Sequence, residues 1–160
     1  MSKPDNSPGF PGSPFSAWRG CTCFELRKLT RTVTRLYDQH LAVAGLKTTQ
    51  YSLLMYVKHE ALPVTRLAAL LGVERTTLSR NLKPLLAAGW VTLQPGTDPR
   101  QRIVTISAAG GAKVRAARAA WRRAQAELEQ TLGAEAVQAL HGQIELSMAR
   151  LAPLLEAGAP

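Results

Sequence analysis

Residues 64–89, VTRLAALLGVERTTLSRNLKPLLAAG, decide the fold of this chain. Thr65 is a capping residue ahead of a short apolar run, which predicts a helix through Leu70. Gly72 then supplies a tight turn, and we expect a second helix from about Arg75. Two short helices around a glycine-containing turn are typical of a helix-turn-helix unit.

The second of these helices has one apolar stripe and one polar stripe. The apolar stripe consists of the leucines at i, i+4, i+7 and i+8, which are Leu78, Leu82, Leu85 and Leu86. The polar stripe consists of Thr76, Ser79, Arg80 and Lys83, all of which can donate a hydrogen bond. Because none of them is acidic, we predict that they contact DNA, together with Arg75 and Thr77. Pro84 is expected to kink the helix while leaving its first two turns intact.

The apolar period changes from helical to alternating after Gly89. Apolar residues at positions 91, 93, 103 and 106 bracket QPGTDPRQ, residues 94–101, and so predict two strands around a Pro/Gly turn. A β-hairpin directly after a helix-turn-helix is a wing. Arg100 and Arg102 lie near its tip, where they can reach phosphates or the adjacent minor groove.

Long amphipathic helices are expected on both sides of this unit. On the N-terminal side, a helix over about residues 17–44 precedes a second helix that Thr49 caps. On the C-terminal side, Ser107 caps another long helix, and Pro153 is expected to end or kink a last one. Their apolar stripes are too long for one small core, which predicts a dimer interface between identical subunits.

The predicted fold class is mostly α with a small β-wing: a winged helix-turn-helix domain plus long N- and C-terminal dimerisation helices. Residues 1–15, rich in proline and glycine, are expected to form a flexible arm. Residues 16–160 are expected to form a single domain. Within it we predict a winged helix-turn-helix lobe at residues 46–107 and a helical dimerisation region at residues 16–45 and 108–155.

The chain carries 20 Lys and Arg against 11 Asp and Glu, a net charge of +9, which favours anionic partners. Residues 127–160 nevertheless hold one basic and five acidic side chains, so the basic excess lies before them. With 46% hydrophobic residues the chain can build a core, which excludes a disordered basic tail. No apolar stretch resembles a membrane span or a signal peptide, so we expect a cytoplasmic protein with no membrane partner.

Several segments resemble the MarR family of bacterial winged-helix regulators. They are LAALLGV (67–73), TLSRNL (77–82), GWV (89–91), DPRQR (98–102) and TISAAG (105–110). The resemblance covers the chain from about residue 21 to 155. It implies a homodimer that binds a pseudo-palindromic site in double-stranded DNA, usually as a repressor, with recognition helices in successive major grooves. It also implies that Asp98 orders the wing and that Arg100 enters the minor groove.

Cys21 and Cys23 open the first long helix, where backbone N–H groups and Arg27 make a positive environment for a thiol. In this respect the chain resembles the family members that sense organic hydroperoxides, which carry Cys-Phe here and a tyrosine 14 residues later, Tyr37 in this sequence. A second tyrosine of those sensors is Thr48 in this chain. Two interpretations follow: a redox-sensing thiol, or a small buried Cys23 with Tyr37 in the core.

The resemblance further implies a small effector, often an aromatic acid, held between the long helices and the winged unit. Arg27, Arg31, Tyr37 and His40 are the candidate residues for it. We expect no metal, because Cys21 and Cys23 point to opposite helix faces and the histidines are not clustered.

No cofactor and no catalysis are expected either, because the sequence has no nucleophile motif and no phosphate loop. The alternative function is a thiol-based, peroxide-reactive protein, sensor or peroxidase, acting through Cys23. A membrane-surface protein is the other class that competes for a basic chain.

Overall fold

The computed structural model describes residues 20–98 and 100–157, with side chains described as far as residue 154. The predicted arm, residues 1–15, lies outside the described residues. The chain divides into two compact units, residues 1–33 and 34–160, and the first helix crosses the boundary. None of the described helices is long and apolar enough to cross a membrane.

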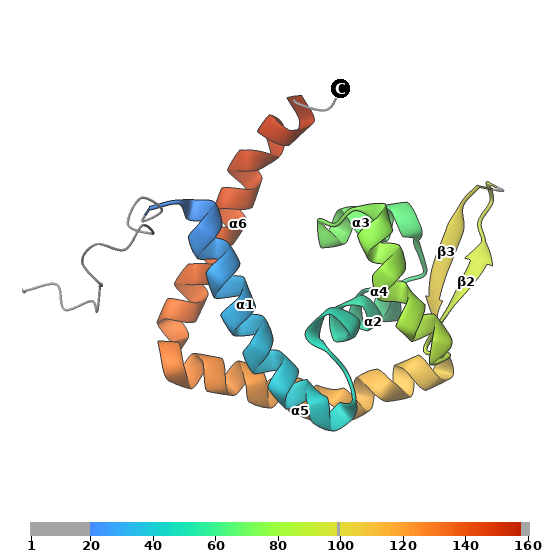
Figure 1. Ribbon diagram of the computed structural model, residues 1–160, viewed down its shortest axis with the longest axis horizontal. Coiled ribbons are helices and arrows are strands. Elements are labelled where there is room, and N and C mark those ends of the chain that lie inside the picture. Colours follow the sequence, from blue (N-terminus) through green and yellow to red (C-terminus); the bar gives the residue numbers. More distant parts are fainter. Residues whose placement is uncertain (1–19, 99, 158–160) are drawn as a thin grey trace, which may run out of the picture. The chain divides into compact units, whose positions relative to one another are not determined.

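The described part is mostly helical with one small sheet, as predicted (Figure 1). In chain order its elements are α1 (Thr22–Leu41), the 3-10 helix η2 (Ala42–Ala44), α2 (Thr48–His59), β1 (Leu62–Pro63), α3 (Val64–Leu71), α4 (Arg75–Ala87), β2 (Val91–Pro95), β3 (Arg102–Ile106), α5 (Ala108–Leu132) and α6 (Ala134–Ala157). Helices α3 and α4 with the hairpin β2–β3 are the predicted helix-turn-helix and wing. The fold class is therefore confirmed.

Two predicted helix caps were wrong. Helix α2 begins at Thr48 rather than after Thr49, and Asp38 of α1 caps it: the Asp38 carboxylate accepts from the Thr48 backbone N–H at 2.6 Å and from its hydroxyl at 2.7 Å. Helix α3 begins at Val64, directly after Pro63, so Thr65 lies inside its first turn. The carboxylate that accepts from the first N–H of α2 lies ten residues upstream. Patterns of neighbouring residues at a helix start therefore do not reveal it.

The turn between α3 and α4 requires its glycine. Gly72 has φ of 60° and ψ of 35°, the left-handed conformation that glycine adopts without steric cost. Its N–H donates to Ala69 O at 3.1 Å, and Val73 N–H donates to Ala68 O at 3.0 Å, which ends α3 within one turn. Helix α4 then runs on through Pro84 to Ala87.

The sheet has three strands, in the order β1-β3-β2, where the sequence predicted only the hairpin. The additional strand β1 is two residues long, and Leu62 pairs with Val104 in antiparallel register. On the other side of β3, Leu93 pairs with the same Val104. A two-residue strand has no detectable alternation, which is why the sequence pattern did not show it.

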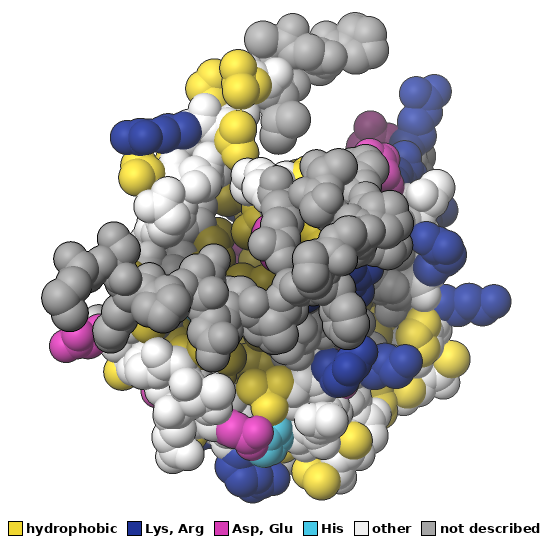
Figure 2. All heavy atoms as spheres, turned by 60° about the vertical axis from the view of Figure 1, so that its left-hand side comes forward, with side chains coloured by type: hydrophobic (Ala, Val, Ile, Leu, Met, Phe, Trp, Pro, Cys, Tyr) yellow, Lys and Arg dark blue, Asp and Glu magenta, His cyan; other side chains and the backbone are white. Residues whose placement is uncertain are grey.

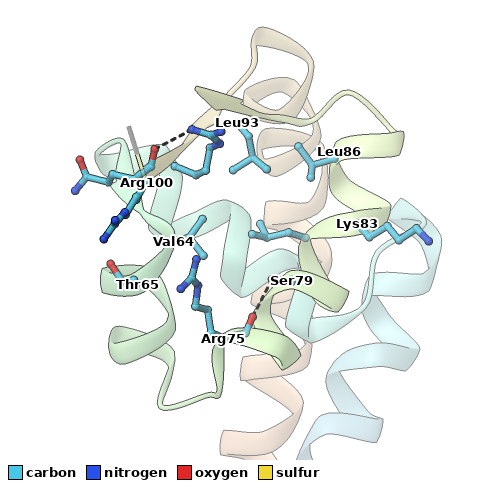
Figure 3. A pocket seen from close by; sticks show the side chains of 11 residues that line it. Val64, Thr65, Arg75, Ser79, Lys83, Leu86, Leu93 and Arg100 are labelled. Carbon is cyan, nitrogen blue, oxygen red and sulfur yellow. Dashed lines mark hydrogen bonds between the residues drawn. The ribbon is translucent and has the colours of Figure 1, made fainter. Parts of the chain in front are cut away.

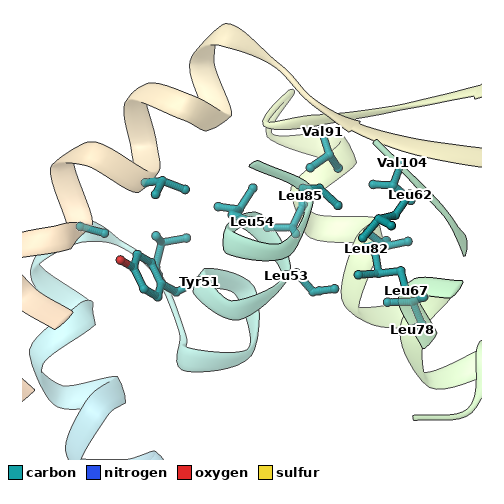
Figure 4. Close-up of a cluster of buried hydrophobic side chains, with 14 of the residues drawn as sticks. Tyr51, Leu53, Leu54, Leu62, Leu67, Leu78, Leu82, Leu85, Val91 and Val104 are labelled. Atoms are coloured by element: carbon teal, nitrogen blue, oxygen red, sulfur yellow. The ribbon is translucent and has the colours of Figure 1, made fainter. Parts of the chain in front are cut away.

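The core lies where α2, α4 and the sheet meet (Figure 4). Its fully buried side chains include Leu53, Leu54, Leu62, Leu67, Leu78, Leu85, Val91 and Val104. Of the four leucines of the predicted apolar stripe of α4, Leu78, Leu82 and Leu85 are buried and Leu86 is half-buried. Burying a leucine contributes on the order of 2 kcal/mol, so this stripe fixes the rotation of α4 about its axis. The polar residues of α4 are thereby held outward.

The base of the wing is tied to the first turn of α5. Ser107 caps α5 as predicted: its hydroxyl oxygen accepts from Gly110 N–H at 3.0 Å and its O–H donates to Gly89 O at 2.6 Å. The Ser107 N–H donates to Trp90 O at 3.0 Å. The Lys113 ammonium lies 4.6 Å from the centre of the Trp90 ring, a cation–π contact. These contacts fix the orientation of the hairpin on α5.

Helix α6 extends past its proline. Of the two outcomes expected at Pro153, an end or a kink, the first is wrong, because the helix runs on to Ala157. One proline costs a helix a single backbone hydrogen bond and some steric strain, which an end turn can absorb. Ile144, Met148 and Leu151 fall at i, i+4 and i+7 and are 42%, 64% and 51% exposed in this single chain. Helix α6 thus presents an apolar stripe that residues 20–98 and 100–157 leave exposed.

Candidate nucleic-acid interface

The structure divides the polar residues of α4 between two neighbouring faces. Arg75, Ser79 and Lys83, spaced by four residues, line a cavity between α4 and the wing. Thr76 and Arg80 do not line it and are exposed on the adjacent face. The sequence pattern placed Ser79 and Lys83 on the same stripe as Thr76 and Arg80, because spacing alone does not show where the wing lies. Helix α4 therefore has a wing-facing side and an outward side.

The cavity has a volume of about 430 Å³ and joins α4 to both strands of the hairpin (Figure 3). Its lining residues are Val64, Thr65, Arg75, Ser79, Leu82, Lys83, Leu86, Leu93, Arg100, Gln101 and Arg102. Four of these side chains are cationic, and none of the described lining residues is acidic. Five of the predicted DNA-contact residues are thus brought together around one concave surface.

Hydrogen bonds set how available the polar groups of α4 are. The Ser79 hydroxyl donates to Arg75 O at 2.9 Å, so its proton is engaged by its own helix and its oxygen remains an acceptor. Arg80 Nη2 lies 3.4 Å from the Thr77 hydroxyl oxygen, and Thr77 is half-buried. Among the predicted contacts on α4, Thr77 is therefore the least accessible.

The wing tip is organised by Asp98. Its carboxylate accepts from the Arg100 backbone N–H at 2.7 Å, and its carbonyl accepts from Gln101 N–H at 2.9 Å. Gly96 N–H donates to Gln101 O at 3.1 Å and closes the loop. This is a turn held by an Asp side chain bonded two residues on. The Asp98 carboxylate thus bonds to the backbone of the loop, whereas the Arg100 side chain is exposed.

Other basic side chains are spread over the described surface. Figure 2 shows Lys and Arg side chains, in dark blue, standing out mainly along the right-hand side of one face. The surface ion pair of Arg66 with Glu60, at 3.7 Å and with both partners exposed, adds little stability. The cavity between α4 and the wing brings four cations, from α4 and from the hairpin, to one concave surface.

The candidate redox residues are placed as follows. Cys21 is half-buried, Cys23 is exposed in the first turn of α1, and neither forms a disulfide. The Tyr37 hydroxyl donates to Gln125 Oε1 of α5, and Gln125 Nε2 donates to Glu129 Oε1 at 2.7 Å. Burial, with a smaller contribution from the charge of Glu129, raises the pKa of Tyr37 above its usual 10.0. Tyr37 is thus a buried residue that bonds to α5.

The effector residues predicted from the sequence all lie on α1. His40 Nε2 lies 2.8 Å from Glu127 Oε2 of α5, in an ion pair if the ring is protonated. Arg27 and Arg31 are exposed on α1, in the first unit. In the parts of the chain that the structure describes, no group of three or more His, Cys, Asp or Glu could hold a metal ion.

A second cavity, of about 470 Å³, lies between α2 and α5, and none of the predicted effector residues lines it. It is lined by Tyr51, Ser52, Met55, Tyr56, Lys58, His59, Val114, Arg115, Arg118 and Trp121. The Tyr51 and Trp121 rings are stacked, with centroids 6.4 Å apart and planes at 23°. Burial raises the pKa of Tyr51, and Arg118 and Arg122 oppose that shift. Only the packing of α2 on α5 shows this pocket, because its lining residues are distant in the sequence.

Two short helices joined by a glycine turn and followed by a β-hairpin define the winged helix-turn-helix class. In this chain cationic side chains surround the groove between the second helix and the hairpin. Comparison with known proteins identifies the family within that class. Residues 44–102 match the model of the MarR family. No curated protein matches the chain by sequence.

Solved structures match over most of the chain. The M. tuberculosis transcriptional regulator MosR, in complex with DNA, is 32% identical, with 86% of this chain and 97% of MosR covered and a TM-score of 0.70. A mutant MarR from E. coli complexed with operator DNA is 20% identical, with 84% and 98% covered and a TM-score of 0.75. The transcriptional repressor CouR, bound to a 23-mer DNA duplex, is 20% identical, with 82% and 95% covered and a TM-score of 0.73.

The chain belongs to the MarR family. It is a DNA-binding transcriptional regulator with a winged helix-turn-helix fold.

Proposed function

We propose that this protein is a homodimeric repressor that binds a pseudo-palindromic operator through α4 and the wing. The observation that carries the proposal is the convergence of Arg75, Lys83 and Arg100 around one groove between a helix and a hairpin. A helix of this size fits the major groove, and a wing beside it reaches the flanking backbone or minor groove. We also propose that the protein is cytoplasmic and that it catalyses no reaction.

Each candidate residue has a role in this proposal. Thr76 and Arg80, on the outward face of α4, read base edges, while Arg75 and Lys83 neutralise phosphates. Arg100 and Arg102 of the wing contact the minor groove or its phosphates. Asp98 holds the turn that presents them. Ser79 and Thr77 have weaker contact roles, because the first is bonded to its own helix and the second is half-buried.

The dimer would be formed by the elements outside the winged lobe. We propose that residues 46–107 bind DNA and that the helices of residues 16–45 and 108–155 join two subunits. The exposed apolar stripe of α6 supports this, since large side chains such as Met148 gain by burial against a second copy. A dimer would carry twice the +9 of the chain, which favours salt-dependent DNA binding.

Selection of bound sequences from random duplex DNA tests the proposal. The expected product is an inverted repeat whose half-sites lie about 10 base pairs apart, one turn of B-DNA. Recovery of no preferred sequence, or of a single half-site without symmetry, would contradict a dimeric operator-binding repressor.

Release by a small effector is a further part of the proposal, and the cavity between α2 and α5 supports it. Stacked Tyr51 and Trp121 suit a planar ring, and Arg115 and Arg118 suit a carboxylate. A panel of aromatic acids should quench Trp121 fluorescence and weaken operator binding, and Arg118→Ala should reduce both effects. Equal responses of the wild type and the variant would remove this cavity from the proposal.

A second candidate function is thiol sensing or peroxide reduction through Cys23, favoured by the exposure of that residue in the first turn of α1. An organic hydroperoxide would transfer one oxygen to the thiolate, giving a sulfenic acid and an alcohol. Residues 14 apart on one helix are separated by about 21 Å of rise, so a tyrosine hydroxyl near the thiol would have to be Tyr37 of a second subunit.

Mass spectrometry and operator binding before and after stoichiometric cumene hydroperoxide test thiol sensing. Oxidation that is lost in Cys23→Ser, but not in Cys21→Ser, is the expected result. Steady turnover of peroxide with a thiol reductant, measured without DNA, would instead indicate a peroxidase. No change in mass or in DNA affinity would exclude both.

A further inference from the structure

Pro84 lies inside helix α4, in its last turn, and its ring is exposed. Proline has no N–H, so the hydrogen bond that residue 84 would donate to the Arg80 carbonyl, one turn back, cannot form in this helix. An exposed ring also gains little free energy from burial. Pro84 therefore lowers the stability of α4, and the packing of its own side chain does not compensate for the loss.

Helix α4 is nevertheless well ordered around the proline. Leu82 and Leu85, on either side of Pro84, are buried in the core. The Ala88 N–H donates to the Pro84 carbonyl at 3.0 Å, so the helical bonding continues past the proline. The Arg80 carbonyl thus belongs to a helix that is fixed by the core, but it lacks its helical donor.

The position of Pro84 on the helix connects it with the residues proposed to read bases. Thr76, Arg80 and Pro84 are spaced by four residues, and all three are exposed on the outward face of α4. The Arg80 guanidinium can only donate hydrogen bonds. The carbonyl of the same residue adds an acceptor to this face, and Pro84 keeps that acceptor from being used within the helix.

We propose that Pro84 is a positioning residue for base recognition: it leaves the Arg80 carbonyl to accept a hydrogen bond from a base amino group of the operator. This role rests on the proposed function, because it requires the outward face of α4 to meet base edges. In the major groove the amino donors are N4 of cytosine and N6 of adenine. Guanine and thymine present acceptors there, so the carbonyl discriminates against them.

Pro84→Ala tests this role directly, because it restores the N–H that bonds the Arg80 carbonyl within the helix. The midpoint of urea unfolding should rise, since alanine is the better helix former. Operator affinity should nevertheless fall about tenfold, and the preference for cytosine or adenine should be lost at one position of each half-site. The salt dependence of binding should not change, because no charge is removed. Anisotropy titrations and selection from random DNA measure these effects.

A proline elsewhere provides the matched control. Pro153 is also an exposed proline inside a helix, but it lies in α6, outside the winged lobe. Pro153→Ala should also raise the unfolding midpoint, while operator affinity and base preference stay as in the wild type. Analytical ultracentrifugation checks that both variants keep the oligomeric state of the wild type. An equal loss of affinity in the two variants would overturn the proposal, because stabilising any helix would then weaken DNA binding.

An ester analogue separates the missing N–H from the shape of the ring. Lactic acid, introduced at residue 84 by nonsense suppression, has the methyl group of alanine but an ester oxygen in place of the N–H. The Arg80 carbonyl again has no helical donor, so this protein should bind the operator with the affinity and base preference of the wild type. Binding as weak as that of Pro84→Ala would overturn the proposal, because the ring itself would then be what matters.

Failure of this proposal can be distinguished from failure of the proposed function. If Pro84→Ala keeps the affinity and base preference of the wild type, the role of Pro84 is wrong and operator binding stands. If the wild type selects no sequence from random duplex DNA, the proposed function is wrong and the role of Pro84 is wrong with it.

Discussion

Gly110 of α5 packs directly against the backbone of Trp90, at the base of the wing. A Cβ added at residue 110 would lie 2.0 Å from the Trp90 carbonyl oxygen, a separation that real structures do not allow. Two consecutive glycines should weaken the first turn of a helix. Gly110 is tolerated there because only a residue without a side chain lets the wing base and α5 approach so closely.

The neighbouring glycine provides a matched comparison for this contact. Gly110→Ala should lower the free energy of unfolding by about 2–3 kcal/mol, because the methyl group forces the wing away from α5. Gly111→Ala should raise it by about 0.5–1 kcal/mol, since its Cβ would meet only the mobile end of Arg115 at 3.6 Å. Urea unfolding of both variants measures the difference. Similar effects in the two variants would show that the close approach to Trp90 does not constrain residue 110.

Asp98 should contribute to DNA affinity without touching DNA. Asp98→Ala removes the acceptor for the Arg100 N–H, so the wing tip loses its order. Operator affinity should fall about fivefold, which is the effect expected from losing one hydrogen bond to a charged group in an exposed loop. Asp98→Asn keeps a carbonyl acceptor and should lose less. Anisotropy titrations measure both. A gain in affinity for both variants would indicate instead that the negative charge itself opposes DNA.

The two faces of α4 should behave differently in binding experiments. Arg75→Ala and Lys83→Ala should weaken binding to all sequences and lower the salt dependence, log K against log[salt], by roughly 1 each. Thr76→Ala and Arg80→Ala should instead relax the selected base preference at particular positions. Selection from random DNA with each variant, together with salt titrations, separates the two classes. Relaxed preference in Arg75→Ala alone would reverse the assignment of the faces.

Tyr37 should make stability depend on alkaline pH. Burial and Glu129 raise its pKa in the folded state above 10.0, so the folded chain holds this proton more tightly than the unfolded chain does. Its contribution to stability is therefore complete below pH 10 and is lost as the pH rises from there through the folded-state pKa. Urea unfolding between pH 9 and 11 should show a shallower decline for Tyr37→Phe than for the wild type. Equal slopes would show that Tyr37 does not carry the effect.

The features that sequence patterns predicted well are local ones. The Gly72 turn, the Ser107 cap and the buried leucine stripe of α4 each depend on residues within a few positions of one another. The features that were missed depend on residues distant in the chain. Asp38 caps α2 from another helix, β1 exists only because β3 is available to pair with it, and Gly110 is required by Trp90.

The same distinction holds for the site. Sequence spacing identified the cationic residues of α4 and the wing, but the rotation of α4 against the hairpin decides which of them share a cavity. The cavity between α2 and α5 depends on long-range packing of Tyr51 on Trp121, whereas the predicted effector residue His40 pairs with Glu127.

In the proposed complex, two copies of α4 and the wing bind two half-sites on one face of DNA. The most direct measurement compares the affinity of the protein for its selected operator with that for the same operator carrying about 5 extra base pairs between the half-sites, half a helical turn. We expect the insertion to reduce binding to the level of unrelated DNA, since one recognition helix then faces away from its half-site. Equal affinity for the two duplexes would contradict the claim.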